Sequence, residues 1–183
     1  MFIVIEGLDG VGKTTIGKSL SRRLHAKLVK TPPESMHLFH KFFQKRSPSN
    51  LSFLFYFFSV MIVSLKIRLN IKKNSFICVR YLNSTLAYHY SFNYDLQIRK
   101  FSFLIKKPDL QIFLILNENE RKKRLKFRNK QSNIDLLTTI SGVRKKILYK
   151  YYKNIHGVTI IDTTNKSVQE IVNIIIYEIT NIK

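Results

Sequence analysis

Short apolar segments rich in β-branched residues alternate along the chain with longer segments of amphipathic character. The short segments are typical of buried strands and the longer ones of helices. This alternation predicts βαβ units, in which helices cover a parallel sheet. The predicted strands lie at 2–6, 27–30, 75–79, 109–116 and 158–162. The predicted helices lie at 13–24, 35–45, 50–72, 83–100, 117–128, 136–154 and 167–181.

The length of the chain sets the expected number of domains. With 183 residues, of which 45% are hydrophobic, it can bury one substantial core and is too short for two ordinary domains. No internal repeat, linker or low-complexity tract divides it. We therefore expect a single domain over 1–183, of α/β class, with a five-stranded parallel sheet flanked by helices.

Two features of the sequence bear on the compartment. The chain opens on the apolar run 2–5 without the basic region, long apolar region and small-residue cleavage site of a secretory signal, so we expect a cytoplasmic protein. Cys78 is the single cysteine, which excludes an internal disulfide. It lies in the apolar run 76–79, and we interpret it as a buried, unreactive thiol.

The run from Leu51 to Leu65 contains no charged residue. Its 15 residues fall short of the roughly 20 that a helix needs to span a bilayer. Basic residues at 66, 68, 72 and 73 follow it. The pattern favours a buried core helix whose end emerges into solvent, and no membrane span is expected.

The formal net charge of +21 favours polyanionic partners, through counterion release and long-range attraction. Nucleotides and nucleic acids both qualify. AT-rich coding sequence alone also produces such abundance of Lys, Ile, Asn and Phe. The positive residues are spread through the predicted helices rather than gathered in one arginine-rich tail, so we expect nucleic acid to bind only non-specifically, if at all.

The segment after the first predicted strand has the full spacing of a phosphate-binding loop. Gly7-Leu8-Asp9-Gly10-Val11-Gly12-Lys13-Thr14-Thr15 fits G-x-x-x-x-G-K-[ST] between a strand and a helix. Its glycines let the backbone curl around an anion, so that N–H groups and the helix N-terminus point at phosphate. Lys13 adds a cation for the β and γ phosphates, and the Thr14 hydroxyl is placed to ligate Mg²⁺. The predicted phosphate-binding residues are Gly7, Gly10, Val11, Gly12, Lys13, Thr14 and Thr15.

Phosphoryl transfer needs further cations, because negative charge spreads over the transferring group. Arg80 follows a predicted strand, and open parallel sheets bind ligands at the carboxyl ends of their strands. The segment 121–130 carries seven Lys or Arg and leads into the polar stretch 131–133. It predicts a lid over about 121–135 that closes on the triphosphate, although a solvated helix face fits the same charge run. Arg144, on the next predicted helix, is a further candidate.

Four stretches of the chain resemble the thymidylate kinase family, and the similarity covers nearly the whole length. The opening FIVIEGLDGVGKTT resembles the family's first strand and phosphate-binding loop, including the acidic Asp9. The segment from Arg80 to Tyr88 resembles its Asp-Arg segment and Ser-Thr-x-Ala-Tyr continuation. The stretch 108–114 looks like the strand that leads to the lid, and 161–165 looks like the loop near the adenine of ATP.

The resemblance implies a P-loop nucleotide kinase fold, with Mg²⁺ and ATP as donor and a nucleoside monophosphate as acceptor. The catalytic residues would be Lys13, Arg80, Arg124 and Arg128. The acceptor-binding residues would be Asp9, Phe42, Arg80, Ser84, Thr85 and Tyr88. Thr163 and Asn165 would lie on the adenine side. Phe39 and Phe42 are candidates for stacking on the acceptor base, with simple core packing as the alternative. A homodimer through exposed apolar helix faces is also implied, and the run 51–65 is available for it.

The chain departs from the family pattern at several positions. Val79 stands where the family has an acidic residue near Mg²⁺, and Ser59 stands where it has an arginine that grips the acceptor's phosphate. The segment 31–34 replaces an Arg-Glu-Pro-Gly stretch, and His89 replaces a common glutamine near the base. Glu6, at the end of the first strand, is a candidate substitute near the metal.

Three functions remain open at this point. The first is ATP-dependent conversion of dTMP to dTDP. The second keeps phosphoryl transfer but uses another small acceptor, because the acceptor-side residues depart most from the pattern. The third is a catalytically impaired kinase fold that only binds nucleotide. Losing a charged partner of phosphate removes about 2–5 kcal/mol of interaction, so Val79 and Ser59 favour this third function.

Overall fold

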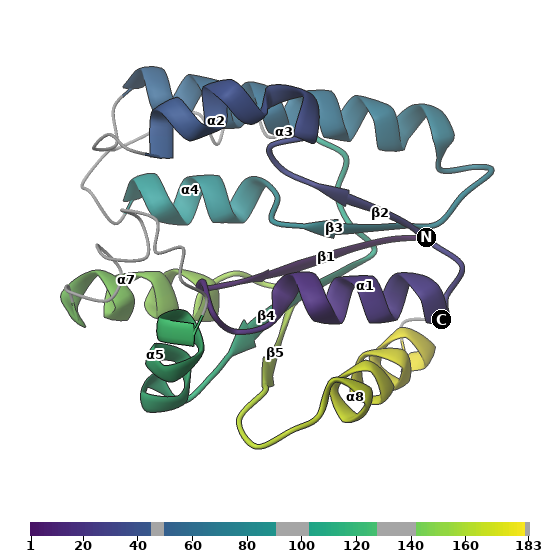
Figure 1. The fold of residues 1–183 in the computed structure, drawn as a ribbon. Helices are drawn as coiled ribbons and strands as arrows, with labels where there is room; N and C mark the ends of the chain where they lie inside the picture. Colours follow the sequence, from purple (N-terminus) through teal and green to yellow (C-terminus); the bar gives the residue numbers. More distant parts are fainter. Residues whose placement is uncertain (45–49, 91–102, 128–141, 182–183) are drawn as a thin grey trace.

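The computed structural model describes residues 1–44, 50–90, 103–127 and 142–181. Five strands form one parallel sheet in the order β2-β3-β1-β4-β5, with β1 at its centre (Figure 1). The strands are β1 (Phe2–Gly7), β2 (Lys27–Lys30), β3 (Phe76–Val79), β4 (Leu110–Ile115) and β5 (Val158–Asp162). The predicted α/β class and five-stranded parallel sheet are confirmed, with each strand within one residue of its expected ends.

The helices follow the predicted order. They are α1 (Lys13–Arg23), a 3₁₀ turn η1 (Glu34–Met36), α2 (His37–Gln44), α3 (Asn50–Asn70), α4 (Leu82–Tyr90), α5 (Glu118–Phe127), α7 (Gly142–Lys153) and α8 (Val168–Asn181). The predicted helix at 35–45 therefore begins as a 3₁₀ turn. The predicted helical positions 45, 91–100, 128 and 136–141 lie outside the described residues.

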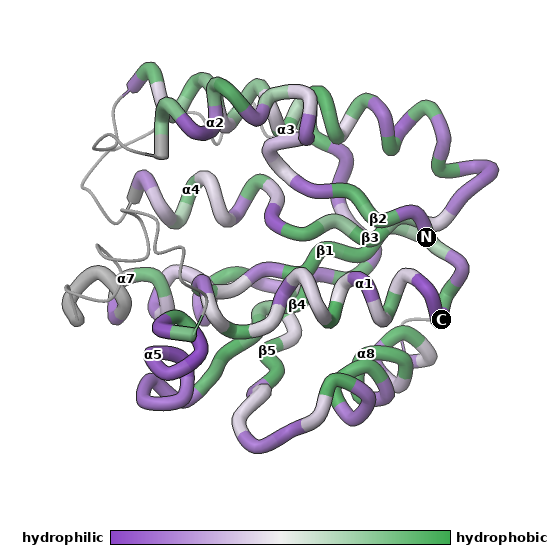
Figure 2. Tube along the Cα trace, viewed as in Figure 1, coloured by the Kyte–Doolittle hydropathy of each residue, from purple (hydrophilic) through white to green (hydrophobic). Residues whose placement is uncertain are grey.

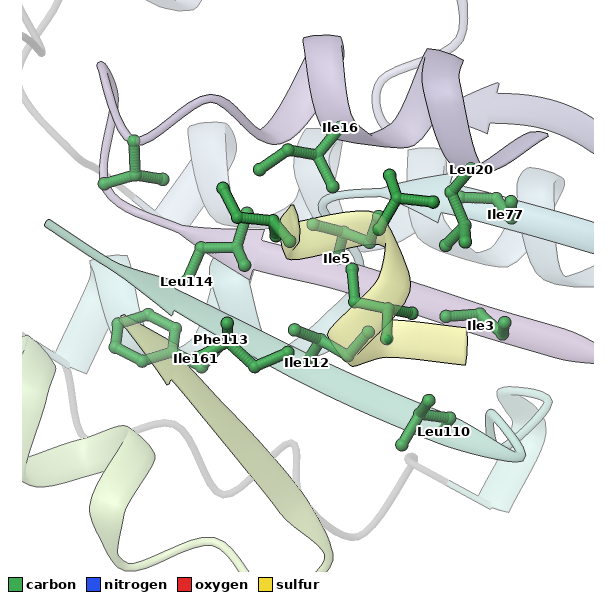
Figure 3. Packing of buried hydrophobic residues seen from close by; sticks show 14 of the residues in the cluster. Ile3, Ile5, Ile16, Leu20, Ile77, Leu110, Ile112, Phe113, Leu114 and Ile161 are labelled. Atoms are coloured by element: carbon green, nitrogen blue, oxygen red, sulfur yellow. The ribbon is translucent and has the colours of Figure 1, made fainter. Parts of the chain in front are cut away.

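Two layers of helices cover the sheet, and β1 divides its side chains between them. Ile3 and Ile5 belong to the core cluster that includes residues of α1 and α8, and Figure 3 shows them beside Ile16 and Leu20. Phe2 and Val4, which point to the opposite face, belong to the cluster formed with α3. All four β1 side chains are fully buried, so a one-residue slip of this strand would exchange both sets.

Helix α3 is apolar on two faces. Its inner face contributes Phe53, Val60 and Ile67 to the core, which confirms the predicted core helix for that face. Its outer face carries an exposed apolar stripe at a spacing of three to four residues, namely Leu51, Leu54, Phe58, Ile62, Leu65 and Leu69. With 21 residues and a mean hydropathy of 1.7, α3 meets the length and composition of a membrane span, but 44% of its apolar window is buried inside the protein. Core packing therefore accounts for much of its apolar character.

The prediction for α3 compares two aliphatic side chains near its end. Ile67 is fully buried and Leu69 is 75% exposed. Ile67→Ala should lower the free energy of unfolding by about 2–5 kcal/mol, because it leaves a cavity in the core. Leu69→Ala should change it by less than about 0.5 kcal/mol. Urea denaturation of both variants tests this, and equal effects would contradict the assignment of the two faces.

Candidate active site

The phosphate-binding loop connects the carboxyl end of β1 to the first turn of α1 (Figure 1). Gly7 has φ of 142°, and a Cβ at this position would lie 2.5 Å from the carbonyl oxygen of Leu114 on β4. Gly12 has φ of 98° and is the N-cap of α1. Both positions need glycine, one for close approach to the neighbouring strand and both for a backbone conformation that L-residues rarely adopt. The strand, loop and helix that the motif requires are therefore all present.

Three charged side chains meet at this loop. Lys13 is only 6% exposed, and its Nζ donates to the carbonyl oxygen of Leu8 at 2.7 Å and to Asp9 Oδ1 at 3.1 Å. The same Asp9 oxygen accepts from the Arg80 guanidinium. The structure thus brings together three residues that sequence reasoning assigned to phosphate binding, catalysis and the acceptor.

Arg80 is held in place through its backbone. It lies directly after β3 with φ of 66°, in the left-handed region that is uncommon for residues other than glycine. Its N–H donates to the carbonyl oxygen of Ile5 at 3.0 Å, and its own carbonyl oxygen accepts from Thr31 Oγ1 at 2.7 Å. Such conformations persist only where the surroundings hold them, and they cluster at functional sites. Thr31, in the segment that departs from the family pattern, supports this conformation.

Glu6 is fully buried next to this corner of the sheet. Its Oε1 accepts from the backbone N–H groups of Tyr81 at 3.0 Å and Ser84 at 3.2 Å, and its Oε2 accepts from the Tyr152 hydroxyl at 2.5 Å. Burial raises the pKa of the Glu6 carboxyl above its ordinary value, although these hydrogen bonds oppose the rise. Oε1 holds the start of α4 and Oε2 holds Tyr152 of α7, so the structure supports a role in orienting these helices rather than in binding metal.

The acceptor-side candidates on α4 follow from this support. Ser84 is in the first turn of α4, and its Oγ lies 3.4 Å from the Tyr152 hydroxyl oxygen. Thr85 is 8% exposed, and its carbonyl oxygen is hydrogen-bonded to His89 Nδ1 at 2.8 Å. Tyr88 is half-buried one turn further on. α4 starts two residues after Arg80, so its first turn lies at the carboxyl end of β3. The phosphate-binding loop lies at the same end of the sheet, because β1 and β3 are parallel.

The two phenylalanines of α2 lie elsewhere. Phe39 is 65% and Phe42 is 45% exposed, and both line an apolar groove between α2 and α3. The interpretation of this pair as simple core is therefore wrong, because α2 lies beside α3, away from the strands, and leaves both rings exposed (Figure 1).

Arg121 has a role that the sequence pattern did not indicate. It is the first residue of the basic segment 121–130 that predicts a lid, yet its side chain is fully buried. Its Nη1 donates to the backbone oxygen of Asp9 at 3.0 Å, while Nε and Nη2 donate to Glu118 at 3.1 and 2.8 Å. A Cβ on Gly10 would lie 3.0 Å from Arg121 Cγ, so loop and helix are closely packed. Arg121 thus attaches α5 to the phosphate-binding loop. The sequence signal for this role is Glu118, which lies three positions earlier on the same helix and can pair with Arg121.

The other lid candidates differ in what the structure describes. Arg124 is 39% exposed and pairs with Glu120. Its Nη1 lies 4.0 Å from the position of a Cβ on Gly12, close to the loop. Figure 2 shows that α5, which carries it, is hydrophilic along most of its length. Arg128 and positions 128–135 of the predicted lid lie outside the described residues, and so does the side chain of Arg144.

The adenine-side candidates lie after β5. Thr163 is fully buried, and its hydroxyl donates to the carbonyl oxygen of Ile115 at 2.9 Å. Asn165 is exposed with φ of 54°. The Asn117 N–H donates to Thr164 Oγ1 at 2.9 Å, which ties the loop after β5 to the loop after β4. Both loops lie at the carboxyl edge of the sheet, where nucleotides bind in such folds.

Two of the positions that depart from the family pattern, Val79 and Ser59, are buried. Val79 is 4% exposed and packs against Gly17 of α1. Ser59 is fully buried, and its hydroxyl donates to the carbonyl oxygen of Tyr56 at 2.7 Å.

Cys78 is also fully buried, as predicted, and burial raises the pKa of its thiol. Among the described residues, no group of three or more His, Cys, Asp or Glu side chains is placed to hold a metal.

A doubly covered parallel sheet with this loop at the end of its central strand defines the protein as a P-loop nucleotide kinase. The thymidylate kinase family model matches residues 5–175, so the chain belongs to the thymidylate kinase family of nucleoside-monophosphate kinases. A probable thymidylate kinase of Methanocaldococcus jannaschii is 32% identical over 187 residues, covering 100% of this chain and 97% of that one. A probable thymidylate kinase of Methanococcus maripaludis is 34% identical over 203 residues, covering 99% and 98%.

Solved structures agree on the fold. The thymidylate kinase of Candida albicans superposes with a TM-score of 0.77 at 23% identity, covering 100% of this chain and 93% of that one. A deoxyadenosine kinase of M. mycoides gives a TM-score of 0.72 at 17% identity, covering 98% and 100%. The predicted resemblance and the P-loop kinase fold are therefore confirmed.

The first prediction for the site concerns Arg121. Arg121→Met keeps the volume of the side chain but removes the donors to Asp9 and Glu118. It should lower the free energy of unfolding by about 2–3 kcal/mol, because a loop carbonyl and a carboxylate lose their partner. Lys122→Met, at an exposed position of the same helix, should have little effect. Denaturation of both variants tests this; equal stabilities would contradict a supporting role for Arg121.

The second prediction uses the raised pKa of Glu6. A carboxyl whose pKa is higher in the folded state holds its proton more tightly there, so its contribution to stability falls as pH rises above the ordinary value of 4.5. Glu6→Gln does not titrate and keeps an acceptor for Tyr81 and Ser84. The stability of the native chain relative to Glu6→Gln should therefore decline between pH 4.5 and 7.5. Urea midpoints across this range test it, and a rising difference would contradict it.

Proposed function

We propose that this chain transfers the γ-phosphoryl group of ATP to dTMP, giving ADP and dTDP. The observation that carries the proposal is the meeting of Lys13, Asp9 and Arg80 at the mouth of the phosphate-binding loop. Lys13, which contacts the phosphate-binding loop, and Arg80, which follows the neighbouring strand β3, both pair with the Asp9 carboxylate there. This arrangement suits a reaction in which two phosphorylated substrates must meet in line.

On the donor side, the loop amides and Lys13 bind the β and γ phosphates. Phosphate oxygens compete with Leu8 and Asp9 for the Lys13 ammonium, so ATP binding exchanges internal hydrogen bonds for contacts with the ligand. Arg124, beside Gly12, neutralises charge on the transferring group, and Arg128 joins it if the segment 121–135 closes as a lid. Thr163 and Asn165 lie on the adenine side.

The residues present fit one Mg²⁺ bound with ATP. Mg²⁺ usually takes one or two protein ligands and completes its shell with phosphate oxygens and water, so a cage of several side chains is not required. The Thr14 hydroxyl, in the first turn of α1, is the ligand that the loop offers. The metal would supply charge neutralisation between the β and γ phosphates. With Val79 at the end of β3, this chain lacks a carboxylate there.

On the acceptor side, Arg80 bridges the two substrates, and Asp9, Ser84, Thr85 and Tyr88 orient the monophosphate. Glu6 supports this arrangement because it holds the first turn of α4. Phe42 is available for base stacking only if the nucleotide reaches the edge of the groove that it lines.

The decisive test is steady-state ADP production with Mg-ATP and each common nucleoside monophosphate. Turnover should depend on the acceptor and be highest with dTMP. Lys13→Ala should lower kcat by about 10²-fold or more, because it removes charge stabilisation of the transferring group. Lys18→Ala, at an exposed position of α1, should leave turnover unchanged. If ATP binds but no monophosphate stimulates turnover, the proposed reaction is wrong.

We also propose that the protein forms a homodimer through the α2–α3 groove, which we define by Leu38, Phe39 and Phe42 of α2 with Leu54, Phe58 and Met61 of α3. The groove has a volume of about 930 Å³ and an apolar lining. Contiguous apolar surface of this kind marks interaction sites. Leu54 and Phe58 of the groove also belong to the exposed stripe of α3. A two-fold dimer brings the same patch of both copies together, so a second copy of the chain can cover this continuous apolar surface.

Light scattering after size exclusion tests the dimer. The native chain should have twice the monomer mass, and Phe58→Glu should shift it to the monomer, because a charge would be buried at the interface. Lys66→Glu, an exposed change on the same helix, should leave the dimer intact. A native monomer would contradict the proposal, and binding of that monomer to lipid vesicles would assign the groove to a membrane surface instead.

A further inference from the structure

His89, near the end of α4, is fully buried and hydrogen-bonded through both ring nitrogens. Its Nδ1 lies 2.8 Å from the carbonyl oxygen of Thr85, one turn earlier on the same helix. Its Nε2 lies 3.3 Å from the hydroxyl oxygen of Ser52, which is also buried and lies in the first turn of α3. The ring therefore connects two helices that are separated by β3 in the sequence.

The two partners of His89 decide which ring nitrogen carries the proton. A carbonyl oxygen can only accept a hydrogen bond, so Nδ1 carries a hydrogen and donates to Thr85. Burial lowers the pKa of His89, so the ring is neutral at neutral pH and Nε2 remains an acceptor. The Ser52 hydroxyl therefore donates to Nε2. His89 is thus held in one tautomer, with a different partner for each nitrogen.

Ring contacts fix the orientation of the His89 imidazole as well. The Phe53 ring, on α3, meets it edge-on at 4.9 Å, and the Tyr88 ring, on α4, meets it edge-on at 5.5 Å. Phe53 is itself fully buried in the core cluster that α3 forms with the sheet. A ring with these contacts and two hydrogen bonds cannot rotate without breaking them, so it attaches α4 to α3 at a defined position.

Helix α4 is thereby attached at both ends. At its start, Glu6, which directly precedes the phosphate-binding loop, accepts hydrogen bonds from two backbone N–H groups. Near its end, His89 attaches it to α3. Thr85 and Tyr88 lie between or beside these attachments, on the acceptor side of the proposed reaction. Their placement relative to the loop therefore depends on His89 as well as on Glu6.

We propose that His89 is a positioning residue for the acceptor: through Ser52 it holds α4 where Thr85 and Tyr88 can contact the nucleoside monophosphate. The inference rests on the proposed function, because it needs a monophosphate beside α4. The donor side is built on the phosphate-binding loop and α5. Loss of the attachment to α3 should therefore weaken acceptor binding and leave ATP binding unchanged.

Ser52→Ala removes the donor on α3 and leaves the bond from His89 to Thr85 in place. With Mg-ATP, this variant should have a KM for dTMP about three- to ten-fold above the native value, as expected for the loss of one ordinary hydrogen bond. Its kcat and its KM for ATP should not change. Steady-state kinetics measures all three. An unchanged KM for dTMP, or equal increases in the KM of both substrates, would overturn the inference.

Two amide substitutions separate the attachment to α3 from the bond within α4. The longer side chain of His89→Gln places its amide near the position of Nε2, where its oxygen can accept from Ser52. The shorter side chain of His89→Asn places its amide near Nδ1 and reaches only the Thr85 carbonyl. The KM for dTMP should stay near the native value in His89→Gln and rise in His89→Asn as it does in Ser52→Ala. Equal values in the two variants would count against the attachment to α3.

Ile67→Ala controls for a general loss of stability. Ile67 is fully buried near the other end of α3. Its truncation should lower the melting temperature more than Ser52→Ala does, yet leave the KM for dTMP at the native value. If His89 had a purely structural role, the KM for dTMP would follow the melting temperature across all four variants.

Amide hydrogen exchange of the free protein tests the attachment without any substrate. Ser52→Ala should speed exchange in α4 and leave exchange in α1 unchanged, because only α4 loses an attachment. Unchanged exchange in α4 would overturn the inference. If the native chain turns over no monophosphate, the proposed function fails, and the acceptor role of His89 fails with it. Native turnover of dTMP combined with an unchanged KM in Ser52→Ala would defeat this inference alone.

Discussion

The hydrogen-bonded position of β1 between β3 and β4 is the constraint on which the site depends. Its carboxyl end supplies the phosphate-binding loop, whose first glycine has room only because no Cβ meets the Leu114 carbonyl. The Ile5 carbonyl fixes the backbone of Arg80, and Glu6 fixes the start of α4. The phosphate-binding loop, the backbone of Arg80 and the start of α4 are thus all attached to the last residues of one strand, whose other side chains are buried in the core.

A second level of organisation connects this strand end to α5. The guanidinium of Arg121 bonds the Asp9 backbone, while the Asp9 carboxylate bonds Lys13 and Arg80. One residue of the loop therefore receives contacts from α5, from α1 and from the end of β3. Because Arg124 is one turn beyond Arg121, the packing of Gly10 against α5 also places Arg124 close to Gly12 of the loop. Movement of α5 would be transmitted to the loop through these contacts.

The departures from the family pattern are compatible with phosphoryl transfer. Val79 is buried against Gly17 of α1, and buried Ser59 donates its hydroxyl to the carbonyl oxygen of Tyr56. Thr31 uses its hydroxyl to support the backbone of Arg80. Lys13, Arg80 and Arg124 still place positive charge at or near the loop, where it can stabilise a transferring phosphoryl group.

The sequence by itself determined the strands, the order of the helices and the loop with Lys13 and Thr14, because apolar periodicity and glycine spacing are local properties. It also indicated Arg80, because ligands in open parallel sheets bind at the carboxyl ends of the strands. Only the tertiary structure decided that Arg121 supports the loop, that Glu6 holds α4, and that Phe39 and Phe42 are exposed. The hydrogen bonds of Arg121 to Asp9 and of Tyr152 to Glu6 join residues 112 and 146 positions apart along the chain. No local pattern encodes such contacts, because they form only when the sheet brings distant segments together.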